Sequence, residues 1–320
     1  MIRLAWRQMR LPAIATGIIV AALAIALVLT NRSMTSSMHT SGLSSCLASN
    51  GDCGSLADSF MNKYVVVTGL VSALSFAPAL AGLFWGAPLI AREVEQSTHR
   101  LVWSQSITRA RWFTVRIGLY VLGAAAIGGL LTWLLTWWYG PLVDVEPDRF
   151  NKIQPGMFDS RGVVLVANMV FAFALGTVAG AVIRRTVPAM AVTLVGFIGE
   201  RILFLFERGY LLPPKSITVP FGDLGRAQLT NAWVLHQTLI DGAGRTVTPD
   251  AIANVCSGVV FTRTKTGVGS CAAEHGFRNV VTYQPLSRFW PLQGMESGIL
   301  IAAAVILLAV AAWWTLRRIS

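Results

Sequence analysis

The chain has 320 residues, of which 54% are hydrophobic and only 13% are charged, about half the charged share of an ordinary soluble domain. Its 26 Lys and Arg residues outnumber its 15 Asp and Glu residues, and the formal net charge is +11. The basic residues are scattered in short clusters and form no contiguous stripe, so the composition excludes a typical soluble enzyme and argues against a nucleic-acid partner.

Six stretches are apolar over the length that crosses a hydrocarbon layer about 30 Å thick. The first is about 18 residues long, which exceeds the usual apolar core of a cleaved signal peptide, and the sequence after it offers no small-x-small cleavage site. The sequence therefore predicts an all-α polytopic membrane protein with six transmembrane helices. The predicted spans are residues 13–30, 64–91, 117–140, 162–183, 186–206 and 297–316.

Positively charged residues predict the orientation of these spans. If the N-terminus is cytoplasmic, the inner segments contain twelve arginines against two acids, Glu93 and Glu95, whereas the short outer loops contain more acids than cations. The positive-inside rule therefore places both termini in the cytoplasm. Arg3, Arg7 and Arg10 recur at helical spacing before the first span, which predicts a short interfacial helix that ends where Pro12 turns the chain into the membrane; a frayed basic tail is the alternative.

All four cysteines fall in the predicted outer segments, which indicates disulfide bonds in an oxidising compartment. Pairing within each loop is the simplest of the three possible connectivities. Zinc is the competing interpretation, with His236 and His275 in the same long loop, but neither cysteine pair has the two-residue separation of a zinc knuckle, so we expect no metal site. The four are Cys46 and Cys53 in the first outer loop, and Cys256 and Cys271 in the loop after the fifth span.

The loop between the fifth and sixth spans, residues 207–292, is too long for a simple connection and is expected to fold as a small extracellular α/β cap. The run from Thr248 to Asp250, with proline second, predicts a helix start that leads into Cys256. Residues 259–266 are rich in β-branched side chains and predict a strand. The chain thus divides into spans one to five at 1–206, the cap at 207–292, and the sixth span with its cytoplasmic tail at 293–320.

Glu200 and Arg201 are the two ionisable residues deep inside a predicted span. Counted from Pro188 at about 1.5 Å per residue, they lie roughly 18 Å into the layer. An unpaired charge there costs about 3 kcal/mol on insertion scales, so each should face protein or water. Glu296 lies at a compatible depth for Arg201, which favours an intramembrane ion pair or gate. If the fifth span ends early, both residues instead lie at the outer interface.

The segment between the second and third spans carries the most specific pattern. It begins Arg92-Glu-Val-Glu95, continues with Thr98 and contains a Ser-Ile-Thr-Arg turn at 106–109. This arrangement resembles the ABC type-2 permeases, the membrane subunits of a class of ATP-binding-cassette transporters dominated by exporters, in which an Arg-Glu-x-Glu segment and a Ser-x-x-Arg turn lead into the third span. Ser97 departs from the glycine that is common in that family, and the run at 99–103 departs from its more aliphatic sequence.

A second stretch strengthens the resemblance. The sequence Tyr-Gln-Pro-Leu-Ser-Arg-Phe-Trp at 283–290 precedes the last span and is similar to a stretch found in an actinobacterial-type branch of these permeases. The resemblance implies a bacterial cell-membrane protein that pairs with a second copy or a similar permease, docks a separate ATPase and moves a small hydrophobic or amphiphilic substrate among membrane lipids. It also implies a cytoplasmic coupling helix at about 92–108. The coupling residues would be Glu93, Glu95, Thr98, Arg100, Trp103 and Arg109.

The chain contains no Gly-x-x-x-x-Gly-Lys-Ser/Thr phosphate loop and no catalytic signature. We therefore expect no enzyme activity and no cofactor in this chain, with ATP and magnesium bound by the partner ATPase. The alternative function is a non-transporting sensor or assembly component, in which the cap binds an extracellular ligand.

Overall fold

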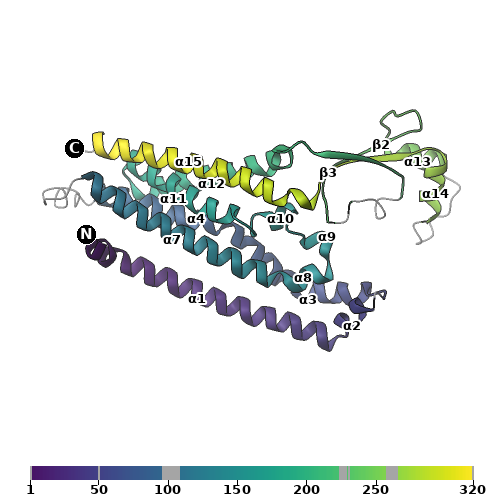
Figure 1. Cartoon of the computed structure of the whole chain (residues 1–320), viewed down its shortest axis with the longest axis horizontal. Coiled ribbons are helices and arrows are strands. Elements are labelled where there is room, and N and C mark those ends of the chain that lie inside the picture. The colour runs from purple at the N-terminus through teal and green to yellow at the C-terminus, as the bar shows by residue number, and fades with distance from the viewer. Residues whose placement is uncertain are drawn as a thin grey trace.

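The computed structural model describes residues 2–49, 51–95, 109–222, 229, 231–256 and 266–318. In this part of the chain, six helices are long and apolar enough to cross a membrane, which confirms the predicted number. They form an elongated bundle (Figure 1). The start of α1 and the end of α15 lie at one end, called the terminal end below, and the cap lies at the other, called the cap end. The spans are Ala13–Thr40, Gly54–Glu93, Phe113–Trp138, Val164–Ile183, Thr186–Tyr210 and Leu286–Arg317.

Most spans extend beyond their predicted ends. The first belongs to a helix of 39 residues, α1, which would be about 58 Å long and therefore longer than the hydrocarbon layer. Contrary to the expected separate interfacial helix, α1 continues through Pro12 without a break. The long helices of the bundle are α1 (Ile2–Thr40), α3 (Gly54–Ser72), α7 (Arg109–Trp138), α11 (Val164–Ile183), α12 (Thr186–Glu207) and α15 (Phe289–Arg318).

The second span is interrupted twice, each time next to a proline. Proline lacks the backbone N–H and its ring clashes with the carbonyl four residues earlier, so a regular α-helix cannot pass through it undisturbed. Pro78 follows a short 3₁₀ segment, and Pro88 follows a π-helical segment. The span therefore consists of α3, η1 (Ala73–Phe76), α4 (Ala77–Ala81), η2 (Gly82–Gly86) and α5 (Ala87–Glu95).

The helix α11 lies at the centre of the bundle. Two-thirds of its apolar window is buried, twice the share of any other span. It packs against α15, α7, α12 and the second span. Where α11 crosses the second span, the two backbones are in direct contact. Gly82 and Gly86 of the second span face Gly176 and Gly180 of α11. A Cβ atom on Gly82 or Gly86 would lie 2.5 Å from a carbonyl oxygen of α11. Such Gly-xxx-Gly pairs allow close helix packing in membranes.

We expect Gly176→Ala to lower the thermal stability of the detergent-purified protein. The added methyl group would collide with the backbone of Gly82, and overpacking of this kind costs about 1–3 kcal/mol. Gly129→Ala in α7 is the matched control, since a Cβ there meets nothing within 4 Å. Equal unfolding temperatures for the two variants would show that the crossing does not depend on backbone contact.

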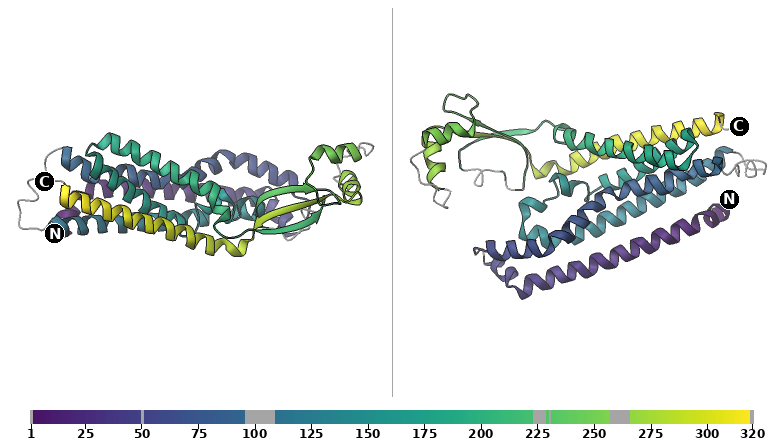
Figure 2. Two further views of the ribbon diagram at one scale, coloured as in Figure 1. Left: turned by 90° about the horizontal axis from the view of Figure 1, so that it is seen from above. Right: turned by 180° about the vertical axis from the view of Figure 1, so that it is seen from behind.

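The segment between the last two spans, residues 211–285, is called the cap below. Its three-stranded antiparallel sheet has the order β1-β3-β2, with Val281 of β3 fully buried between Ile217 and Gln237. Both views in Figure 2 show this sheet extending beyond the bundle from the start of α15. The strands are β1 (Lys215–Pro220), β2 (Trp233–Ile240) and β3 (Arg278–Gln284).

Two helices accompany the sheet. The helix α13 (Pro249–Val255) begins at the predicted proline, with Thr248 as its N-cap residue. The second is α14 (Thr266–Glu274). The strand predicted at 259–266 lies outside the described residues except for Thr266, where α14 begins. The sequence interpretation missed the three strands of the sheet.

Candidate functional site

The two acids of the Arg-Glu-x-Glu pattern bind other helices of the same chain at the terminal end of the bundle. Glu93, near the end of α5, forms a salt bridge with Arg116 in the first turns of α7. Both side chains are mostly buried, at 21% and 13% exposed. A charge pair that is shielded from water is stronger than a surface pair, so this contact ties the end of the second span to the start of the third.

Glu95 holds the first turn of α12. One of its carboxylate oxygens accepts the backbone N–H of Thr186 at 3.1 Å, and the other accepts the Thr186 hydroxyl at 2.6 Å. The N-cap residue of α12, Arg185, offers no side-chain cap of its own, so a carboxylate 91 positions earlier in the chain takes that role. The hydroxyl and amide of Thr186 lower the pKa of Glu95, with a further contribution from Arg185.

The remaining coupling candidates are not placed by the structure. Thr98, Arg100 and Trp103 lie outside the described residues, and so does most of the predicted coupling helix. Arg109 is the first residue of α7, and its side chain is not described. In the sequence, the segment 96–108 connects the end of α5 to the start of α7. The salt bridge between Glu93 and Arg116 joins these same two helices.

A buried ion-pair network lies toward the cap end. Arg208, in η3 (Arg208–Tyr210), donates to both carboxylate oxygens of Glu296 in α15, at 2.6 and 2.7 Å, and also to Asp159. Arg201, two helical turns earlier, forms a salt bridge with the second oxygen of Asp159. The side chain of Arg208 is 2% exposed and that of Glu296 is fully buried. The network therefore joins α12, η3 and α15 to the residue that follows α10 (Pro155–Phe158).

This geometry corrects the partner expected for Arg201. The sequence favoured Glu296, but Arg201 binds Asp159, and Glu296 binds Arg208 instead. The helix α12 continues past Glu200 and Arg201 to Glu207. The sequence did not identify Asp159 or Arg208, because Asp159 precedes the fourth predicted span and Arg208 follows the fifth. The separation of Arg201 and Arg208 by two helical turns, which places them on one face, is a signal that could have identified Arg208.

Glu200 differs from the other members of the network. Both of its carboxyl oxygens are buried, and no described residue lies within hydrogen-bonding reach of them. The charges that act on it are those of Arg201, Glu296, Asp159 and Arg208. Glu200 is therefore close to the network without forming any of its ion pairs.

A cavity of about 530 Å³ adjoins the network between the second span and α12. Its volume falls in the range that accommodates a drug-sized molecule. Asp159, Arg201 and Arg208 provide charged groups at one wall, and most of the other lining is apolar or small. The lining residues are Gly69, Ser72, Ala73, Ser75, Phe76, Pro155, Gly156, Asp159, Ile198, Arg201, Ile202, Leu205 and Arg208.

The Tyr-Gln-Pro-Leu-Ser-Arg-Phe-Trp stretch anchors the cap to the bundle. The side-chain amide of Gln284 donates to the carbonyl oxygens of Gly209 and Leu212, at 2.9 and 2.8 Å, just beyond the end of α12. Arg288 donates to Gln284 and to the carbonyl of Pro213. The last strand of the cap and the start of α15 are therefore held against the helix end that carries Arg201 and Arg208.

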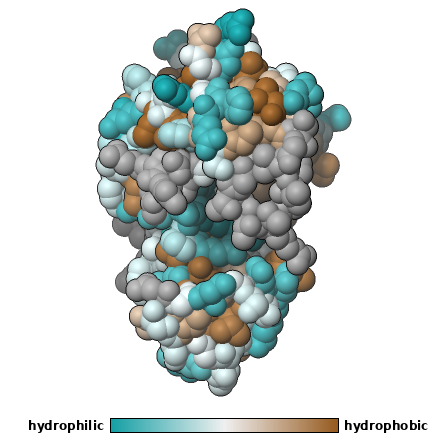
Figure 3. Space-filling view, turned by 90° about the vertical axis from the view of Figure 1, so that its right-hand side faces the viewer, coloured by the Kyte–Doolittle hydropathy of each residue, from teal (hydrophilic) through white to brown (hydrophobic). Residues whose placement is uncertain are grey.

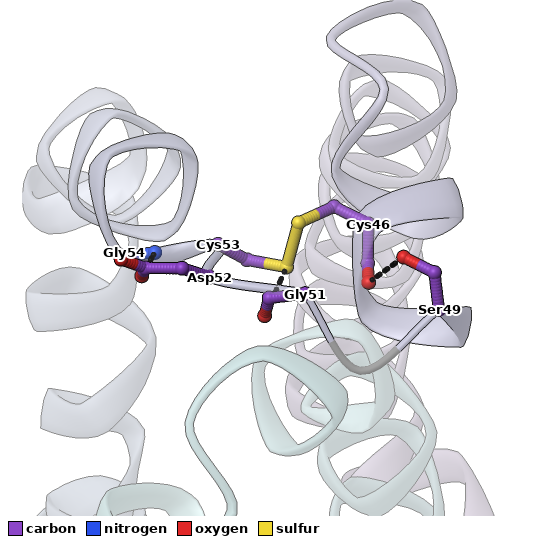
Figure 4. The surroundings of a disulfide bond; sticks show 6 residues. All are labelled: Cys46, Ser49, Gly51, Asp52, Cys53 and Gly54. Carbon is purple, nitrogen blue, oxygen red and sulfur yellow. Dashed lines mark hydrogen bonds between the residues drawn. A yellow bond between two sulfur atoms is a disulfide. The ribbon is translucent and has the colours of Figure 1, made fainter.

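Both disulfide bonds form within their own loops, as the sequence favoured. Cys46 at the end of α2 (Leu43–Ala48) is joined to Cys53, the residue before α3, and the bond links the first two spans at the cap end (Figure 4). The second bond joins Cys256 to Cys271. His275 lies beside that pair, and the three side chains have a spacing that a metal ion could use. Because both sulfur atoms are already bonded to each other, they are not available as thiolate ligands.

The surface of the cap end differs from the sides of the bundle. Viewed from this end, two lobes are separated by a recess in which hydrophilic residues are visible (Figure 3). The sides of the bundle, in contrast, expose large apolar side chains, such as Ile18, Val195 and Phe206, all more than 60% exposed. This distribution fits a molecule whose sides contact lipid and whose end contacts water.

Comparison with known families gives one result. The family model described as ABC-2 membrane transporter related matches residues 17–208, more than half of the chain. The match covers the first five spans, both helix-joining acids and most of the ion-pair network, and it ends before the cap. No match was found among curated proteins or among solved structures.

Proposed function

The chain belongs to the ABC-2 membrane transporter related family, and we propose that it acts as the permease subunit of an ATP-driven exporter in the bacterial cell membrane, in an actinobacterial-type branch. In this proposal, two copies, or this chain and a similar one, enclose the substrate path. Each copy docks a separate ATPase that binds ATP and magnesium. The terminal end faces the cytoplasm, and the cap with its disulfide bonds faces the oxidising exterior.

The observation that carries this proposal is the pair of contacts made by Glu93 and Glu95. The segment that follows Glu95 is the one expected to receive the ATPase. Glu93 connects its start to α7 through Arg116, and Glu95 connects it to α12 through Thr186. A displacement of that segment would move α12 directly. The helix α12 also carries Arg201 and lines part of the cavity. In this proposal, the contacts of Glu93 and Glu95 therefore connect the ATPase to the substrate path over a short distance.

The pairing of two copies is supported by the exposure of α1. Only 6% of the apolar window of the first span is buried, and both Figure 1 and Figure 2 show α1 at the edge of the bundle. Apolar side chains such as Ile14, Ile18, Ile25 and Leu29 are more than half exposed along this helix. In the proposed assembly they contact lipid or the second permease. The apolar cavity wall favours a small hydrophobic or amphiphilic substrate.

We expect the protein, when produced with its ATPase, to purify as a complex of two permease and two ATPase chains that transports substrate only with ATP. Six spans make one half of the twelve-span pathway expected for this class. Native mass measurement of the detergent-extracted complex gives the composition, and vesicle uptake tested against a panel of lipids and drugs gives the substrate. A stable particle with a single permease chain and no ATPase would contradict the proposal.

A further inference from the structure

The ion-pair network contains an unequal number of charges. Asp159, Glu200 and Glu296 supply three acids, whereas Arg201 and Arg208 supply two cations. They are the charged groups that act on Glu200 from α12, η3, α15 and the residue after α10, whereas Arg161 in the same segment lies over the ring of Tyr139. The elements α11, α4 and η2, which also pack against α12, have no titratable side chain, and α5 carries Arg92, Glu93 and Glu95. With all five groups ionised, the network would therefore carry one surplus negative charge among mostly buried side chains.

The contacts show which acid is in surplus. Asp159 binds both arginines, one through each oxygen, and Glu296 binds Arg208 through both of its oxygens. Glu200 receives no hydrogen bond from any described residue, and both of its oxygens are buried. A buried carboxylate without a partner is much more costly than the neutral acid. Glu200 is the member of the network for which binding a proton removes an uncompensated charge.

We infer that Glu200 is a proton-binding site whose occupancy depends on the state of the cavity. In the conformation described, Arg201 is held by Asp159 and Glu200 is a neutral carboxylic acid. When α12 moves away from Asp159, water enters the network from the cavity that Arg201 and Asp159 line. The O–H bond of Glu200 then breaks, the proton passes to water, and the carboxylate that remains is hydrated and lies near two arginines. The inference rests on the proposed function only for this movement.

The direction of the pH effect follows from linkage. A proton that is bound more tightly in the closed conformation stabilises that conformation at low pH, and raising the pH favours the open conformation. A glutamine at this position imitates the neutral acid at every pH. Glu200→Gln should therefore remove the pH dependence and leave the protein as it behaves under acidic conditions.

The direct test is infrared spectroscopy of the purified full-length protein in the carbonyl region of protonated carboxylic acids. We expect the wild type to show such a band at neutral pH, Glu200→Gln to lack it, and Glu207→Gln to retain it. Glu207 is the matched control because it lies on the same helix with an exposed side chain. A band that persists in Glu200→Gln, or a wild type without any band, overturns the inference, and so does a band abolished by sodium, which would indicate a cation at this site.

A second measurement uses the complex with its ATPase. We expect ATP hydrolysis by the wild type to rise from mildly acidic to mildly alkaline pH, and that of Glu200→Gln to stay constant. Failure of Glu200→Gln to fold where Glu207→Gln folds would also contradict the inference, since the amide replaces a neutral acid of the same shape. If the infrared result is as expected but no ATPase binds, the proton site stands and the proposed function fails.

Discussion

Replacing Glu93 and Glu95 together by glutamine is expected to abolish most ATP-dependent transport while membrane insertion and ATP hydrolysis continue. The amides keep the volume of the side chains but remove both negative charges. Arg116 then loses the negative charge of Glu93, and hydrogen bonds to charged groups are worth about 1.5–3 kcal/mol. A loss of this size changes an equilibrium roughly tenfold or more, so we expect transport per ATP hydrolysed to fall by at least that factor.

The single variants separate the two contacts. Glu93→Gln removes the charge that pairs with Arg116 of α7, and Glu95→Gln removes the charge that binds Thr186 of α12. Because Thr186 lowers the pKa of Glu95, its carboxylate remains ionised at neutral pH, and the contact is lost only as the pH falls below the usual range for a glutamate. Glu274→Gln, at an exposed position in the cap, is the control. Transport at wild-type efficiency in the double variant would show that the two acids form an ordinary polar surface.

Arg208→Gln is expected to destabilise the protein by about 3–5 kcal/mol, which is the typical result of removing one partner from a buried ion pair. The reason is that the side chain of Glu296 is fully buried and the guanidinium of Arg208 donates a hydrogen bond to each of its carboxylate oxygens. Arg201→Gln should cost less, because Asp159 keeps its contact with Arg208. Thermal unfolding in detergent, monitored by circular dichroism, gives the comparison.

The control for this series is Arg245→Gln. Arg245 lies on the cap with its side chain 81% exposed and pairs with Asp241, so its removal should change stability by about 0–1 kcal/mol. A lower unfolding temperature for Arg201→Gln than for Arg208→Gln would contradict the assigned pairing, since it would mean that Asp159 depends mainly on Arg201.

Several features of this protein follow from short stretches of sequence. The six spans depend on the local density of apolar residues, and the helix at Pro249 depends on three neighbouring residues. The disulfide pairing depends on cysteines that are 7 and 15 positions apart. In each case the residues that decide the structure are close together in the chain. A short stretch of sequence is therefore enough to predict the feature.

The contacts that carry the proposed function are decided only by the tertiary structure. Glu95 meets Thr186 from 91 positions away, and Arg208 meets Glu296 from 88 positions away. The depth of a charge in its own helix predicts that it needs a partner, but the choice of partner depends on which helix faces pack together. Here α12 and α15 both pack against α11. The sequence alone therefore predicted the need for a partner at Arg201, and only the fold supplied Asp159.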